Sequence, residues 1–284
     1  MNRKSVILCL VTFFSVSFAA LNSGSAHAGS QQTPSAMHQP EEIAVFAKSV
    51  EKYAASKGAR AFIIARVGRP AEDLPKGIQY THTAIAVYSA ITLQSGEIVN
   101  GYAIHNLYQD SDDKSRSVLM TDYPVDFFWG AYELKAGIVI PTPALQSKLI
   151  AAINEGKNKT LHNPKYSVLA SPFNSMYQNC TEHTLDVINA AIYNTTNTAQ
   201  IKLNTSAHFD AQRVHTSRFK LFLGATFMDD ITTRDHKGRV KTATFTSIAN
   251  YLDKFDLSEQ VATLRPSNKP NKPYALDVTG LSSL

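Results

Sequence analysis

The chain has 284 residues, of which 44% are hydrophobic and 18% are charged, and its formal net charge is +5. This composition is typical of a globular protein long enough to bury a core, and it excludes a low-complexity or disordered chain. No basic helix and no alternation of basic and aromatic residues occurs, so we expect no nucleic-acid partner.

The first 28 residues predict a signal peptide. Arg3 and Lys4 form a basic start, an apolar run covers residues 5–20, and an A-x-A cleavage site lies at residues 26–28. The apolar run is shorter than the roughly 20 residues that a membrane-spanning helix needs. We therefore expect cleavage, no transmembrane span in the mature protein, and a periplasmic or secreted location in a bacterium.

Cleavage after Ala28 changes both the charge and the cysteine content. It removes two basic residues, which leaves 26 basic against 23 acidic residues and a net charge of about +3. It also removes Cys9, so that Cys180 becomes the only cysteine. Exported compartments are oxidising, and cysteines there normally pair. A lone exported thiol is therefore buried and inert, linked to another chain, or kept for its reactivity.

Hydrophobic periodicity predicts a flexible lead-in over residues 29–40, one α+β domain over 41–260 and a loosely ordered tail over 261–284. A helix from Pro40 to about Gly58 is followed by a buried strand over 59–67. Strands over 82–93 and 97–108 are joined by a short link ending in Gly96, which favours an antiparallel hairpin. The other expected elements are a strand over 137–140, a helix from Pro143 to about Glu155, a polar loop over 158–178, a helix from Cys180, a helix over 213–228, a hairpin around 235–238 and a helix from Thr246 to about Phe255.

Cys180 is a candidate nucleophile because it lies where the polar loop meets an amphipathic helix. The positive end of the helix dipole and the free backbone N–H groups there favour a thiolate and can stabilise an oxyanion. The competing interpretation is a buried structural cysteine, which is common for a free thiol.

A thiol nucleophile needs a base that a third polar group holds in one tautomer. His82 begins an apolar strand after a polar loop, so its side chain can reach the edge of the sheet. His105 is near the end of the partner strand, where hairpin pairing can bring it close to His82. Asn106 is the alternative orienting residue and points to the opposite face of that strand. His183 lies on the same helix side as Cys180 and is a less well placed base.

We expect no metal and no cofactor. The chain has no H-x-x-x-H pair and no C-x-x-C pair, and scattered His, Asp and Glu residues do not indicate a metal site.

Several segments resemble a bacterial family of proteins, domain-of-unknown-function family 2145. The resemblance runs from about residue 42 to 258, and six segments carry it in the same order: residues 66–69, 80–82, 104–105, 143–153, 165–179 and 227–230. That family resembles the circularly permuted branch of the NlpC-type papain-like superfamily, in which the histidine strand precedes the cysteine helix. Cys180-Thr181-Glu182 is similar to the C-[ST]-E sequence at the start of that helix.

The resemblance implies a single papain-like domain, an antiparallel sheet packed against helices. It implies Cys180 as nucleophile, His82 as base and His105 as the third polar residue. Many members of the unknown-function family carry serine or another residue where Cys180 stands, which keeps a catalytically degenerate domain open as an alternative.

Three functions follow from these observations. The first is an exported cysteine hydrolase that acts on an amide or ester of the cell wall or envelope, such as a peptidoglycan peptide. The second is an acyltransferase that passes the acyl group of the same thioester to or from a lipid. The third is a degenerate papain-like domain that binds an envelope component without chemistry. The oligomeric state does not follow from the sequence.

Overall fold

The computed structural model describes residues 35–93, 95–215, 231–267 and 275–280. The expected signal peptide and the first half of the lead-in, residues 29–34, lie outside these ranges. Within them, no helix combines the length and the apolar content needed to cross a bilayer.

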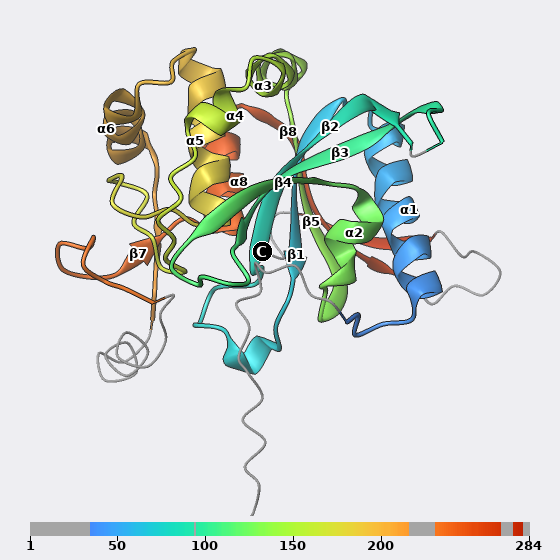
Figure 1. Ribbon diagram of the computed structural model, residues 1–284, viewed down its shortest axis with the longest axis horizontal. Helices are drawn as coiled ribbons and strands as arrows, with labels where there is room; N and C mark the ends of the chain where they lie inside the picture. The colour runs from blue at the N-terminus through green and yellow to red at the C-terminus, as the bar shows by residue number, and fades with distance from the viewer. Residues whose placement is uncertain (1–34, 94, 216–230, 268–274, 281–284) are drawn as a thin grey trace, which may run out of the picture.

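The fold is α+β and is built on a seven-stranded antiparallel sheet (Figure 1). The strand order is β4-β3-β2-β1-β5-β8-β9, and each neighbouring pair is antiparallel. The strands are β1 (Ala61–Val67), β2 (His82–Thr92), β3 (Ile98–Gln109), β4 (Ser117–Asp122), β5 (Glu133–Pro141), β8 (Ser258–Pro266) and β9 (Leu276–Thr279). A separate pair joins β6 (Gln212–Arg213) to β7 (Lys241–Thr242).

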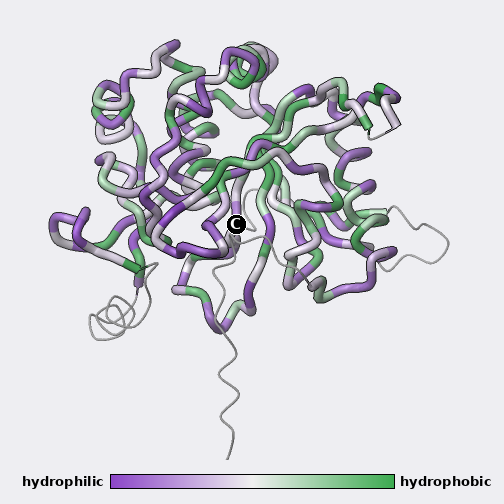
Figure 2. The backbone as a smooth tube through the Cα atoms, in the orientation of Figure 1, coloured by the Kyte–Doolittle hydropathy of each residue, from purple (hydrophilic) through white to green (hydrophobic). Residues whose placement is uncertain are grey.

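Helices cover both faces of the sheet, with α1 and α2 on one side and α3, α5 and α8 on the other (Figure 1). The helices are α1 (Pro40–Ser56), the short 3-10 helix η1 (Ala71–Asp73), α2 (Pro124–Trp129), α3 (Pro143–Asn154), α4 (Lys157–Thr160), α5 (Cys180–Tyr193), α6 (Thr198–His208) and α8 (Phe245–Lys254). We call these two sides the α1/α2 face and the α5 face. The residues of highest hydropathy lie along the central strands, between the helical layers (Figure 2).

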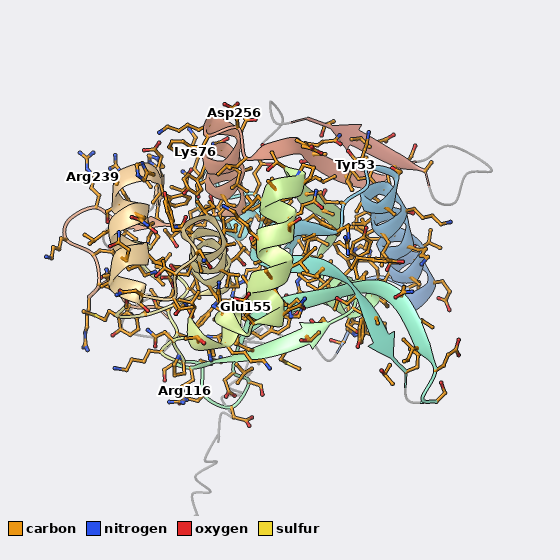
Figure 3. All side chains as sticks on the ribbon, turned by 90° about the horizontal axis from the view of Figure 1, so that it is seen from above. Tyr53, Lys76, Arg116, Glu155, Arg239 and Asp256 are labelled. Atoms are coloured by element: carbon orange, nitrogen blue, oxygen red, sulfur yellow. The ribbon has the colours of Figure 1, made fainter. Side chains whose placement is uncertain are left out.

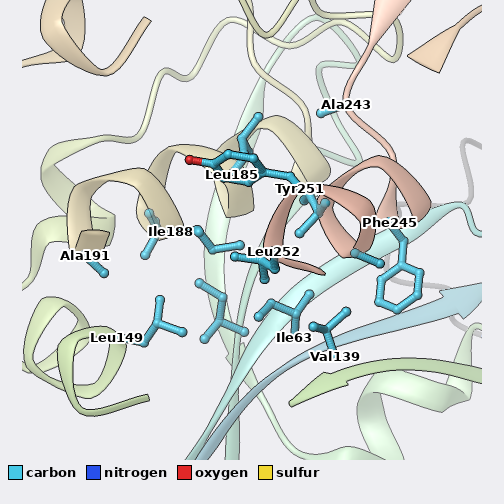
Figure 4. Close-up of a cluster of buried hydrophobic side chains, with 14 of the residues drawn as sticks. Ile63, Val139, Leu149, Leu185, Ile188, Ala191, Ala243, Phe245, Tyr251 and Leu252 are labelled. Atoms are coloured by element: carbon cyan, nitrogen blue, oxygen red, sulfur yellow. The ribbon is translucent and has the colours of Figure 1, made fainter. Parts of the chain in front are cut away.

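Strand alternation divides the core between the two faces. In β1, Phe62 and Ile64 contribute to the cluster on the α1/α2 face, and Ile63 and Ala65 contribute to the cluster on the α5 face. Figure 4 shows the second cluster, where Leu185 and Ile188 of α5 meet side chains of α8 over the sheet. The central strands are therefore buried on both faces, which explains their continuous apolar sequences.

Local signals in the sequence correctly place α1, β1, β2, β3, β5, α3, α5 and α8. The β2–β3 hairpin forms as expected, with Thr92 opposite Ile98. Thr142 caps α3 by accepting a hydrogen bond from the backbone N–H of Leu145 at 3.4 Å. Asn179 caps α5 by accepting one from the N–H of Glu182 at 2.9 Å, so that Cys180 is the first residue of the helix.

Other expectations are wrong. The tail over 261–284 is not loosely ordered throughout, because residues up to Pro266 complete β8 and residues 276–279 form β9 at the edge of the sheet. Arg213 belongs to β6 and does not begin a helix, whereas residues 216–228 of that expected helix lie outside the described ranges. Residues 235–238 form the end of a turn and a bend, and β7 pairs with the distant β6. The cap of α8, expected near Thr246, is Thr244.

Gly137 of β5 is required by close packing between the sheet and α8. A Cβ atom at this position would lie 2.5 Å from a ring carbon of Phe245, which is itself buried in the cluster of Figure 4. We expect Gly137→Ala to lower the free energy of unfolding by about 1–3 kcal/mol, because the ring must shift. Urea denaturation measures this change. Gly280→Ala is the control: no atom lies within 4 Å of its added Cβ, and a loss as large as that of Gly137→Ala would contradict the packing explanation.

Candidate functional site

His82 is part of a buried polar chain on the α1/α2 face. Its Nε2 atom lies 2.9 Å from Oδ1 of Asn106 on the neighbouring strand. The amide nitrogen of Asn106 donates to the carboxylate of Asp122 at 3.2 Å and to the carbonyl oxygen of Ile104 at 3.1 Å. Tyr108 also donates to Asp122. The arrangement links three adjacent strands, β2, β3 and β4, through one continuous set of hydrogen bonds.

These contacts determine the tautomer of His82. Two acceptors hold the amide nitrogen of Asn106, so its oxygen faces the imidazole. Nε2 therefore carries the proton, and Nδ1 carries the free lone pair. Nδ1 is buried and has no hydrogen-bond partner among the described residues. A neutral imidazole held in this way has one nitrogen available to accept a proton.

Aromatic rings and a cation surround the imidazole. The ring of His82 stacks on Tyr108 with 4.7 Å between centroids and an interplanar angle of 9°, and Phe127 of α2 lies 5.5 Å away. Arg66 pairs with His82 in register across β1 and β2 and donates to the carbonyl oxygen of Phe127. Burial, and secondarily the charge of Arg66, holds the pKa of His82 well below its usual range. His82 is therefore neutral at physiological pH.

Cys180 approaches the same strand from the α5 face. Its Sγ atom lies 3.9 Å from the carbonyl oxygen of Thr81, the residue immediately before His82. The next turn of α5 is fixed to Thr83, whose carbonyl oxygen accepts a hydrogen bond from Thr184 at 3.3 Å. The thiol therefore packs against the strand backbone beside His82.

The thiol and the imidazole are not hydrogen-bonded. Thr83 faces α5, and strand alternation turns the adjacent side chain of His82 to the α1/α2 face. Both groups are buried, with exposed fractions of 4% for Cys180 and 0% for His82. Cys180 and His82 therefore both lie at the start of β2, but Sγ and Nδ1 do not form a hydrogen bond.

Burial has the largest effect on the thiol and raises the pKa of Cys180 above its usual value. Hydrogen bonds from the backbone of Thr83 and Thr181 and the charge of Arg66 act in the opposite direction but do not outweigh it. The thiol is therefore neutral at physiological pH, in contrast to the thiolate expected from a helix N-terminus.

We expect iodoacetamide to alkylate Cys180 of the folded protein slowly, at a rate that rises with pH through a midpoint higher than that of the unfolded chain. A raised pKa means that a higher pH is needed to form the reactive thiolate. Mass spectrometry of the peptide containing Cys180 measures the rate at each pH. The urea-unfolded chain is the control, with a midpoint near the ordinary thiol value. A lower midpoint in the folded protein would show that the helix N-terminus and Arg66 outweigh burial.

His105, expected as the third polar residue, is not the residue that contacts Nε2 of His82, which lies against Asn106 instead. It is half-buried between Ile85 and Thr121 in the sheet register, and it points to the face opposite Asn106. Burial, with the charge of Lys159 as a smaller cause, lowers its pKa. Asn106, the alternative left open by the sequence, occupies the orienting position. Asp122 was not identified from the sequence, because only the β3–β4 register brings it to Asn106.

His183 lies next to His162, with 6.3 Å between ring centroids, and burial lowers its pKa to about 3. It makes no hydrogen bond to Cys180. In the described part of the chain, no group of three His, Cys, Asp or Glu side chains is arranged to hold a metal ion.

Comparison with known proteins gives one match. No curated protein and no solved structure matches the chain. A family model matches residues 53–252, a range that includes β1 to β5 of the sheet, the His82 chain of hydrogen bonds and Cys180. The chain therefore belongs to the family described as "Uncharacterized protein conserved in bacteria (DUF2145)".

Proposed function

We infer that the protein is an exported cysteine hydrolase of the permuted NlpC-type papain-like kind, acting on an amide or ester of the bacterial envelope. The observation that carries this proposal is that Asn106, itself bound to Asp122, holds Nε2 of His82 and leaves Nδ1 free. The Cys180 thiol contacts the residue immediately before His82. A base held in one tautomer by a third polar group is what a thiol nucleophile needs.

The proposed reaction uses these groups in a fixed order. Nδ1 of His82 accepts the proton of the thiol as Sγ of Cys180 attacks the substrate carbonyl. Backbone N–H groups at the start of α5 stabilise the tetrahedral oxyanion. The imidazolium then protonates the leaving amine or alcohol, which leaves a thioester on Cys180. Water, deprotonated by Nδ1, hydrolyses the thioester and restores the thiol.

This mechanism requires a change in the site when substrate binds. Both reactive groups are buried, and Sγ must move towards Nδ1 while Nε2 of His82 stays hydrogen-bonded to Asn106. Cys180 is the first residue of α5, so this movement disturbs only the first turn of the helix. The Asn106–Asp122 pair stabilises the imidazolium formed during the reaction, because a carboxylate lies directly behind the amide.

A degenerate, non-catalytic domain is the second candidate. The burial of the thiol, its raised pKa and the lack of a thiol–imidazole hydrogen bond favour it. In this interpretation Cys180 is a core residue, and the domain binds an envelope component.

Turnover of peptidoglycan fragments separates the two candidates. The wild-type protein is incubated with purified muropeptides, and the products are followed by liquid chromatography and mass spectrometry. Release of a peptide or amine, together with an acyl adduct on Cys180 after acid quenching, is expected for the hydrolase. Equal product formation by wild type and by Cys180→Ala would contradict it.

A further inference from the structure

A pocket lies beside α5, lined by residues that the proposed hydrolase does not use. Its volume is about 280 Å³, and it lies between α5, α6 and the loop after α4. Glu182 and Asp186 of α5 and Lys202 of α6 line it, with exposed fractions of 1%, 2% and 6%. Lys165 and Ser175 line its exposed side.

The buried wall of this pocket has two carboxyl groups and one ammonium group. Lys202 donates to both oxygens of Asp186 at 2.8 Å and to Oε1 of Glu182. Asp186 receives a further hydrogen bond from Gln178 at 3.2 Å. The other oxygen of Glu182, Oε2, is buried and has no hydrogen-bond partner among the described residues. One carboxylate oxygen is thus left without a donor.

The charges of the wall do not balance when both carboxyl groups are ionised. Burial, and the charge of Asp186, raise the pKa of Glu182, while Lys202 acts against this change but does not cancel it. A second ammonium group at Oε2 would balance the second carboxylate charge and complete two buried ion pairs, which removes the cost of an unpaired buried acceptor.

We propose that this pocket binds the primary ammonium group of a small amine, which donates a hydrogen bond to Oε2 of Glu182. The volume suits a molecule about the size of a single amino acid. Lys202 is already bound by three carboxylate oxygens, so it has little capacity left to recruit an anion. The proposal does not depend on the activity of Cys180.

The test uses n-butylammonium and its neutral analogue 1-butanol as probes, followed by ¹H–¹⁵N NMR titration of the full mature chain. We expect saturable shifts at Glu182, Asp186 and Lys202 with the amine, and at least about tenfold weaker binding of the alcohol. Glu182→Gln is expected to weaken amine binding about tenfold or more. Glu155→Gln, an exposed carboxylate at the end of α3 (Figure 3), is the matched control and should bind as wild type does.

A variant of a buried charged residue can lose binding because the protein unfolds. A variant at the exposed side of the pocket avoids this ambiguity. Ser175→Trp fills the entrance and leaves the three charged residues unchanged, so it should abolish the saturable shifts. Equal binding of amine and alcohol, or unchanged amine binding in both Glu182→Gln and Ser175→Trp, would overturn the proposal. The Glu182–Asp186–Lys202 cluster would then be only a structural link between α5 and α6.

Discussion

Cys180→Ala is expected to abolish hydrolysis of muropeptides, with a loss of at least about 10³-fold in kcat/KM. The thioester cannot form without Sγ, and no second cysteine exists in the mature sequence as we interpret it. His82→Ala should cause a loss of similar size, because it removes the base and the group that protonates the leaving amine. Thermal unfolding of each variant shows whether the loss arises from the chemistry or from the fold.

Asn106 and His105 provide a matched comparison for the same assay. Asn106→Ala leaves Nε2 of His82 without its acceptor, so we expect more than about a tenfold loss in kcat at an unchanged fold. His105→Ala removes a half-buried side chain on the opposite face and should retain activity. The reverse pattern, with His105 essential and Asn106 dispensable, would contradict the assignment of the orienting residue.

Lys202→Met is expected to produce the largest loss of stability, about 3–5 kcal/mol in the free energy of unfolding. The variant leaves Glu182 and Asp186 buried, at exposed fractions of 1% and 2%, without their shared ammonium group. Chemical denaturation at neutral pH measures the change.

Lys254→Met is the matched control, because Lys254 also pairs with an aspartate, Asp210, at 2.9 Å. Both side chains of that pair are exposed, so its loss should cost about 1 kcal/mol or less. Equal losses of stability in the two variants would contradict the prediction that the buried Glu182–Asp186–Lys202 cluster stabilises the contact between α5 and α6.

The β2–β3 hairpin and the start of α5 were predictable because their signals are local. A short Gly-containing link between two apolar runs favours a hairpin, and Asn179 before an amphipathic run favours a helix cap. In contrast, α6 buries little more than Ile201, Lys202 and Thr205, so its sequence carries only a weak helical pattern. The sequence predicts a tail from residue 261, where residues 261–266 complete β8, because the strand that pairs with β8, β5, is distant in the chain.

The sequence by itself determined that Cys180 begins a helix and that His82 begins a strand, because caps and periodicity depend on neighbouring residues. Only the tertiary structure decided that Asn106 and not His105 holds His82, since strand register sets which side chains share a face. It also decided the direction of the pKa shift at Cys180. The helix N-terminus lowers a thiol pKa locally, but burial depends on every element packed around the site, and burial has the larger effect here.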